Sequence, residues 1–97
     1  MPTHDELEQF LREFRKLSPR ERALLGAAVR AMVDDLKAGM PFRPSLRIKG
    51  VQGYQGIYEM SRAPDGRATF HYGQQVQPGE AHIIWRRIGS HDIFKDP

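Results

Sequence analysis

Hydrophobic residues recur at helical spacing through the first part of the chain, in two stretches that each begin with a helix-start signal. Thr3 and Glu6 can form a capping box, in which a hydroxyl and a carboxylate each bind a free backbone amide. Ser18 and Glu21 repeat that signal with Pro19 at the first helical position, and Gly39 is a typical helix stop. The apolar positions that share one helical face are Leu7, Phe10, Leu11, Phe14 and Leu17, and then Leu25, Ala28, Val29, Met32, Val33 and Leu36. The pattern predicts an antiparallel helical hairpin over residues 3–38.

Beyond Pro41 and Pro44 the apolar period changes to two, which is the period of a strand. Strands are predicted at 46–51, 56–62, 67–73 and 81–88. The sequences Pro64-Asp65-Gly66 and Gln77-Pro78-Gly79-Glu80 are turn signals, so the last three strands should form an antiparallel meander. The last strand is apolar on both faces, which predicts an interior place in the sheet.

Taken together, these patterns predict one α+β domain covering residues 1–97, with the hairpin packed on an antiparallel sheet of about four strands. The sheet and a C-terminal tail would occupy residues 45–97. The strand alternation turns one face of the sheet toward the helices. The polar side chains expected on the opposite face are Arg47, Lys49, Glu59, Arg67, Thr69 and His71.

The net positive charge of the chain comes entirely from its second half. Residues 1–41 hold seven Lys/Arg and seven Asp/Glu, whereas residues 42–97 hold eight and five, which accounts for the net charge of +3. This imbalance indicates either a polyanionic or acidic partner at the sheet half, or simply a solvated basic surface.

Several functional classes find no support in the sequence. There are no cysteines, no apolar run near the roughly 20 residues needed to span a bilayer, and no signal-peptide pattern at the start, so a cytoplasmic protein is expected. The phosphate-binding glycine loop, the HExxH motif and the nucleophile-elbow serine are also missing. Because the spacing of His71, His82 and His91 fits no metal-site pattern, neither a metal nor another cofactor is expected.

The polar sheet face and the histidines have the composition that metal-free RNA cleavage requires. That reaction needs a base for the 2′-hydroxyl, an acid for the leaving 5′-oxygen and fixed positive charge on the phosphate. Histidine suits proton transfer near neutral pH and arginine supplies a permanent charge. A histidine beside basic strands can equally be a solvated surface residue, and the residues alone leave that alternative open.

The order of elements and several short motifs resemble the RelE/ParE superfamily of bacterial toxins. The matching segments are Leu46-Arg47-Ile48-Lys49-Gly50, Gly56-Ile57-Tyr58-Glu59-Met60, Gly66-Arg67-Ala68-Thr69-Phe70 and the tail from Trp85 to Phe94. Within the tail, Gly89-Ser90-His91-Asp92-Ile93-Phe94 is similar to the ending of YafQ-type members, in which the histidine is catalytic. Arg67 resembles the strand arginine that these toxins set against the scissile phosphate.

The resemblance implies the toxin of a type II toxin–antitoxin system: a metal-independent endoribonuclease that cleaves mRNA on the ribosome and represses translation. It assigns catalysis to His91 and Arg67, and it matches Arg47 and Lys49 loosely to a basic segment that binds nucleic acid. The residues themselves add Glu59 to the catalytic set, and His71, Arg87 and Phe94 to the nucleic-acid-binding set. A cognate antitoxin would cover the basic face, and no membrane is involved. Structural roles are the alternatives: an ion pair between Glu59 and Arg67, a loop hydrogen bond for His91, and a lid on the core for Phe94.

The sequence departs from the superfamily at its start, where a β-strand usually precedes the first helix. Met1 leads almost directly into the Thr3 capping box, so that strand is expected to be short or missing. Gyrase-inhibiting members share the fold without the catalytic residues. A non-catalytic binder of this fold and a plain nucleic-acid-binding module are therefore the rival functions.

Overall fold

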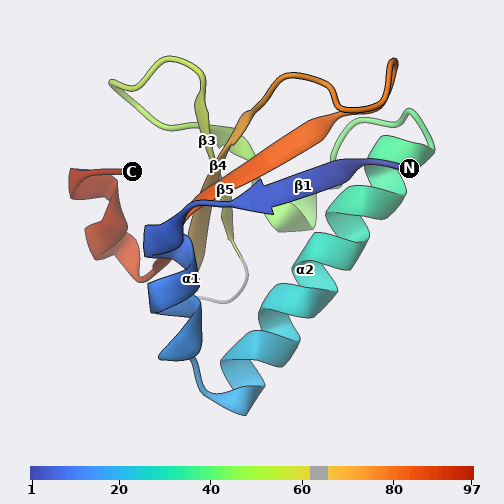
Figure 1. Cartoon of the computed structure of the whole chain (residues 1–97). Helices are drawn as coiled ribbons and strands as arrows, with labels where there is room; N and C mark the ends of the chain where they lie inside the picture. The colour runs from blue at the N-terminus through green and yellow to red at the C-terminus, as the bar shows by residue number, and fades with distance from the viewer. Residues whose placement is uncertain (62–65) are drawn as a thin grey trace.

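The computed structural model describes residues 1–61 and 66–97, and it forms an α+β fold (Figure 1). The elements are β1 (Thr3–Glu6), α1 (Glu8–Arg15), α2 (Pro19–Lys37), η1 (Pro44–Leu46), β2 (Lys49–Gly50), β3 (Ile57–Ser61), β4 (Arg67–Tyr72), β5 (His82–Gly89) and η2 (His91–Lys95), where η denotes a 3₁₀ helix. The strands form one five-stranded sheet in the order β1-β5-β4-β3-β2. The predicted fold class is confirmed, with five strands where about four were expected.

The fifth strand, β1, replaces the helix start predicted at Thr3. It pairs in parallel with β5, Thr3 opposite His82 and Glu6 opposite Trp85. The amides of Thr3 and Leu7 donate to the carbonyls of Ala81 and Trp85, each at 2.9 Å. The helix begins at Glu8 after an uncapped Leu7, so the predicted capping box was wrong. Backbone hydrogen bonds to the distant strand β5 satisfy the amide groups that a helix cap would otherwise satisfy. Pairing with β5 therefore outweighs the capping pattern in the sequence.

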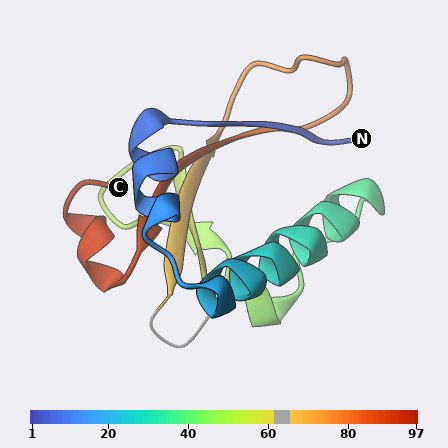
Figure 2. The ribbon, with the colours of Figure 1, turned by 60° about the horizontal axis from the view of Figure 1, so that its bottom comes forward.

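The second helix follows its sequence signals closely. The amide of Ser18 donates to Glu21 Oε1 at 3.0 Å, and the amide of Glu21 donates to Ser18 Oγ at 3.1 Å, which confirms that capping box. Gly39 takes φ +66° just past the helix end, a conformation that favours glycine. The two helices diverge from their joint into an open V (Figures 1 and 2).

The segment predicted as a strand over 46–51 is extended only at Lys49–Gly50. Pro44 instead starts the short helix η1, whose last residue, Leu46, is buried in the core. Arg47 ends η1 with φ 49°, and it is the one non-glycine residue with positive φ in the part of the chain that the structure describes. Proline at the first helical position and the anchoring of Leu46 outweigh the period-two pattern here.

The other three strands agree with the prediction and form an antiparallel meander from β3 to β5. The amide of Glu80 donates to the carbonyl of Gln77 at 3.0 Å, which confirms the turn before β5. β5 lies between β1 and β4, as its apolar character indicated. The register shifts once, because Thr69 faces Arg87 whereas Phe70 faces Trp85, leaving Arg86 as the extra residue of a bulge. Most of the predicted turn Pro64-Asp65-Gly66 lies outside the described residues.

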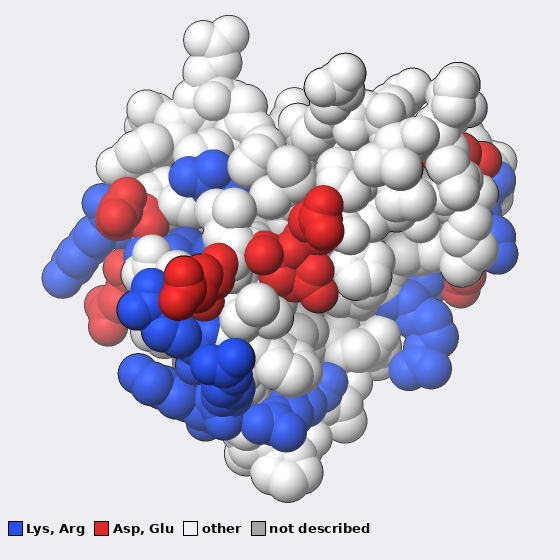
Figure 3. Space-filling model, in the orientation of Figure 1, with Lys and Arg blue, Asp and Glu red and all other residues white. Residues whose placement is uncertain are grey.

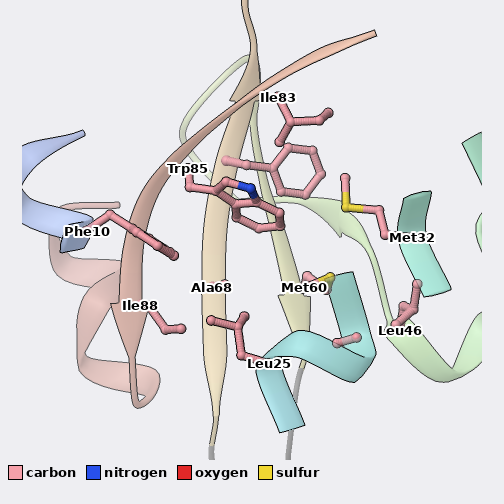
Figure 4. Close-up of a cluster of buried hydrophobic side chains, with 11 residues drawn as sticks. Phe10, Leu25, Met32, Leu46, Met60, Ala68, Ile83, Trp85 and Ile88 are labelled. Carbon is pink, nitrogen blue, oxygen red and sulfur yellow. The ribbon is translucent and has the colours of Figure 1, made fainter. Parts of the chain in front are cut away.

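The core fills the space between the sheet and the two helices (Figure 4). Phe70 is completely buried, with its ring centroid 5.4 Å from that of Trp85 and 5.6 Å from that of Tyr58. α1 contributes Phe10, and α2 contributes Leu25, Ala28 and Met32. We call this side of the sheet the helix face. The opposite side carries residues 90–97 and is called the tail face; Figure 2 shows α2 and η2 on opposite sides of the sheet.

Candidate active site

A cavity of 570 Å³ opens on the tail face, at the β2 side of η2. We call it the tail-face cavity. Its lining residues come from β2 and the loop after it, from β3, from the start of β4 and from η2; they are Lys49, Gly50, Val51, Gln52, Glu59, Arg67, His91 and Phe94. All three predicted catalytic residues and two of the five predicted nucleic-acid-binding residues are therefore found together.

Strand pairing explains why residues so far apart in the sequence converge. Lys49 lies directly opposite Glu59 in the β2–β3 pair. Arg67, the first residue of β4, lies opposite Gly89 at the end of β5, and η2 begins at His91. The register thus places the arginine of β4 beside the point where the chain leaves the sheet for η2.

His91 occupies the first turn of η2 and its side chain is exposed to solvent. Its ring meets that of Phe94 edge to face, with centroids 4.9 Å apart and planes at 86°. Ile93 turns inward and is 3% exposed, so it fastens η2 to the sheet. A Cβ at Gly89 would lie 2.9 Å from the Ile93 side chain, so glycine is needed for this close approach.

The carbonyls that follow η2 are held by side chains from the tail face. Pro97 accepts from the Thr69 hydroxyl and from Arg86 Nε, both at 3.1 Å, and Asp96 accepts from Arg87 at 2.7 Å. Thr69 is completely buried beneath this segment. These bonds fix the backbone that carries His91 and Phe94, so the cavity wall is set by directed polar contacts.

Arg87 does not line the cavity and makes a forked ion pair with Glu13 of α1. Its Nε and its second terminal nitrogen donate to the two carboxylate oxygens at 2.9 and 3.0 Å. This bonding raises the pKa of Arg87 above its ordinary value. The arginine ties α1 to the residues after η2, which is a structural contact, and its predicted role in nucleic-acid binding stays a prediction.

His71 also lies away from the cavity, within the network that fixes the tail. Its Nδ1 is 3.1 Å from a terminal nitrogen of Arg86, so that ring nitrogen accepts the bond. Burial lowers the pKa of His71, and the positive charge of Arg86 lowers it further. The imidazole is thereby held neutral, and its predicted contact with nucleic acid stays a prediction.

Arg47 lies elsewhere as well, lining a separate groove beside α2 together with Arg43 and Leu46. Conversely, Gln52 lines the tail-face cavity although sequence reasoning did not single it out. A lone glutamine in a glycine-containing loop belongs to no motif, so no pattern in the sequence pointed to it.

The cavity can hold a phosphate between fixed cations and place proton-transfer groups beside it. Lys49 and Arg67 supply positive charge, His91 an imidazole, Glu59 a carboxylate, and Phe94 a ring on which a base can stack. Within residues 1–61 and 66–97, no group of three or more His, Asp or Glu side chains could hold a metal ion. None of the helices described is long and apolar enough to cross a membrane.

Basic side chains also gather away from the cavity. Figure 3 shows Lys and Arg around the joint of α1 and α2, where residues 12–22 contain five of them. Residues 1–41 have no net charge as a whole, yet residues 12–22 are basic, because they hold only two acidic residues.

No protein-family model matches the sequence, and no curated protein sequence matches it significantly. Solved structures do match the fold. A copper-bound mutant toxin from Helicobacter pylori shares 18% identity and aligns with a TM-score of 0.61, covering 95% of this chain and 97% of that one. A chain of the Escherichia coli DinJ–YafQ toxin–antitoxin complex shares 13% identity, with a TM-score of 0.63 over 94% and 93%.

A chain of the RelB–RelE antitoxin–toxin complex from Methanococcus jannaschii gives the same result, with 16% identity and a TM-score of 0.60 over 94% of both chains. The match extends over nearly the whole length of each protein. The chain therefore has the RelE/YafQ toxin fold.

Proposed function

We propose that the protein is the toxin of a type II toxin–antitoxin system and cleaves mRNA on the ribosome without a metal ion, thereby repressing translation. The observation that carries the proposal is the convergence of Lys49, Glu59, Arg67, His91 and Phe94 on one cavity. These residues come from separate segments of the sequence, and together they supply each group that the chemistry requires. The RelE/YafQ fold supports the same conclusion.

In the proposed reaction the 2′-oxygen of the RNA attacks the adjacent phosphorus and the bond to the 5′-oxygen breaks. Glu59 accepts the proton of the 2′-hydroxyl and His91 donates a proton to the departing 5′-oxygen. Arg67 and Lys49 hold the phosphate and stabilise the charge that develops on it. Phe94 stacks on a neighbouring base. The products are a 2′,3′-cyclic phosphate and a free 5′-hydroxyl.

The partner in the cell would be a cognate antitoxin, as in the two complexes with the same fold. The proposed toxin acts in the cytoplasm, where ribosomes carry its substrate. Its positive sheet half suits a polyanionic substrate and an acidic inhibitor alike.

Expression in bacteria tests the proposal, with His91→Ala as the decisive variant. The parent chain should arrest growth and leave mRNA fragments, and purified protein should cleave mRNA on ribosomes. His91→Ala should lower the cleavage rate by about 10²–10⁴-fold, the size expected for a lost general acid. His4→Ala, which removes an exposed histidine of β1, is the matched control and should cleave normally.

Three outcomes would contradict the proposal. Normal growth and intact mRNA with the parent chain exclude a toxin of this kind. Growth arrest that persists in His91→Ala together with DNA damage indicates a gyrase-inhibiting binder. Salt-sensitive RNA binding without cleavage indicates a nucleic-acid-binding module.

A further inference from the structure

A second and larger hollow, of 670 Å³, lies between α2 and the segment around η1. We call it the α2 groove. The residues that line it are Leu24, Ala27, Ala28, Ala31, Arg43, Ser45, Leu46, Arg47, Ser61 and Arg67. Arg67 is the only described residue that lines both this groove and the tail-face cavity. The two hollows therefore meet at the residue proposed to hold the scissile phosphate.

The α2 side of the groove is aliphatic. Leu24 and three alanines line it, and Leu24 is 37% exposed although it is a large apolar side chain on an otherwise amphipathic helix. None of the described lining residues is aromatic, so the groove offers no ring on which a nucleobase could stack, in contrast to Phe94 in the cavity. This composition favours the aliphatic side chains of a peptide over single-stranded RNA.

The opposite side is basic, with three arginines and no acidic residue among the described lining residues. Arg43 is fixed in place by Asp35 of α2: its Nε and a terminal nitrogen donate to the two carboxylate oxygens at 3.0 and 2.8 Å. This pairing lowers the pKa of Asp35. The Arg43 side chain is thus held in one position on this side of the groove. Arg47 is exposed to solvent and can form an ion pair with an acidic residue of a partner.

Arg47 is also held in a left-handed backbone conformation, with φ 49°. This conformation is unfavourable for most residues with a Cβ, whereas asparagine tolerates it better. Asparagine would therefore fill the position at lower cost, and the arginine there supplies charge at the rim of the groove.

We propose that the α2 groove is the docking site for an amphipathic helix of a protein partner, with an apolar stripe against Leu24 and acidic residues against Arg47. The inference rests on the proposed function and places the antitoxin's contact beside α2, not over the tail-face cavity. A helix seated there abuts Arg67 and restrains its guanidinium. Docking therefore lowers cleavage without filling the cavity.

Synthetic peptides of about 15 residues, near the shortest length at which isolated helices form in water, provide the probe. One peptide carries a Leu/Ala stripe flanked by glutamates, and its partner carries lysines in place of the glutamates. Titration of the purified chain should show that the acidic peptide binds at least about tenfold more tightly, with an affinity that falls as salt is added. Equal affinities would overturn the proposal.

Two variants locate the binding site. Leu24→Arg should weaken binding of the acidic peptide about tenfold or more by placing a charged side chain across the apolar side. Arg47→Asn should weaken it about two- to fivefold, as expected for one exposed ion pair, while leaving the melting temperature equal or higher. The controls are Leu11→Arg, at the comparably exposed Leu11 of α1 (39%), and Arg12→Asn, also on α1. If the controls weaken binding as much as the groove variants do, the site is wrong.

A cleavage assay separates this inference from the proposed function. The acidic peptide should inhibit cleavage by the parent chain, whereas Leu24→Arg should cleave normally and resist inhibition. If the parent does not cleave, the proposed function fails, and the peptide titrations still decide the groove. If Leu24→Arg instead weakens binding of single-stranded RNA, the groove belongs to the nucleic-acid path and the proposal is overturned.

Discussion

The two faces of the sheet are shielded from solvent by different interactions, and two neighbouring residues of β4 show the contrast. Phe70 and Thr69 are both completely buried. Phe70 points to the helix face, where the rings of Tyr58 and Trp85 flank it from the two neighbouring strands. Thr69 points to the tail face and is covered by residues 90–97, through a hydrogen bond to the carbonyl of Pro97.

The difference explains why the candidate active site lies on the tail face. Apolar contacts are not directional and fill space, so they leave little room for solvated charge. Hydrogen bonds, together with the buried side chain of Ile93, hold the tail at a few fixed points and leave an open cavity beside them, in which Lys49 is exposed and Glu59 and Arg67 are partly exposed. A rigid apolar layer on one side therefore supports a polar surface on the other.

The largest effect is expected from Phe70→Ala on the helix face. Removing the ring leaves a cavity between Tyr58 and Trp85, and the free energy of unfolding should fall by about 3–5 kcal/mol. Urea denaturation measures this. Tyr72→Ala, which truncates a 43% exposed tyrosine of the same strand, should cost far less. Equal losses would show that the buried ring of Phe70 is not the dominant source of stability on the helix face.

Arg87→Gln should produce the next largest effect, because it breaks the connection between α1 and the residues after η2. The substitution leaves Glu13 without its forked partner and removes the bond to the Asp96 carbonyl. For a half-buried pair we expect a loss of about 1.5–3 kcal/mol. Amide hydrogen exchange should rise most in residues 90–97; a uniform rise across the chain would contradict an anchoring role for Arg87.

Thr69→Val should have a smaller effect, although Thr69 is as buried as Phe70. Valine keeps the shape and loses the hydroxyl donor, but the Pro97 carbonyl still accepts from Arg86 and is not left unpaired. The expected loss is about 1 kcal/mol by urea denaturation. A loss as large as that of Phe70→Ala would mean that the two faces do not differ as described.

The smallest effect is a change in pH dependence from His71→Asn. The folded state lowers the pKa of His71 below 6.5, so the unfolded chain binds this proton more readily. Stability from the neutral ring is complete above pH 6.5 and declines as the pH falls toward the lowered folded pKa. Asparagine retains an acceptor for Arg86 without titrating. The urea midpoint of the variant should therefore fall less than that of the parent on acidification, and parallel curves would contradict this.

Most of the fold could be predicted because local signals and tertiary structure agree over long stretches. The α2 capping box at Ser18, its stop at Gly39 and the strands of the meander were all confirmed. The errors lie where a distant partner competes with a local signal. Thr3 and Glu6 pair with β5 instead of capping a helix, and Leu46 enters the core from η1 instead of from a strand.

The candidate site was predictable in its residue types and only partly in its geometry. Motif resemblance indicated His91 and Arg67, the strand pattern indicated Glu59, and the register then brought the three to one cavity. Arg47, His71 and Arg87 shared the same basic character in the sequence. Charge alone cannot distinguish a residue facing a cavity from one paired with Glu13 or Arg86, since that depends on contacts across dozens of positions.

By itself, the sequence determined the two helices, the β3–β5 meander and the chemical groups available, because capping, periodicity and residue type act over a few neighbouring positions. Only the tertiary structure decided that β1 joins β5, that Arg47 leaves the tail face for the α2 groove, and that residues 90–97 close over Thr69. Those outcomes depend on strand register and on hydrogen bonds between distant residues. No local pattern encodes such partners, and folding selects them by satisfying buried polar groups across the whole chain.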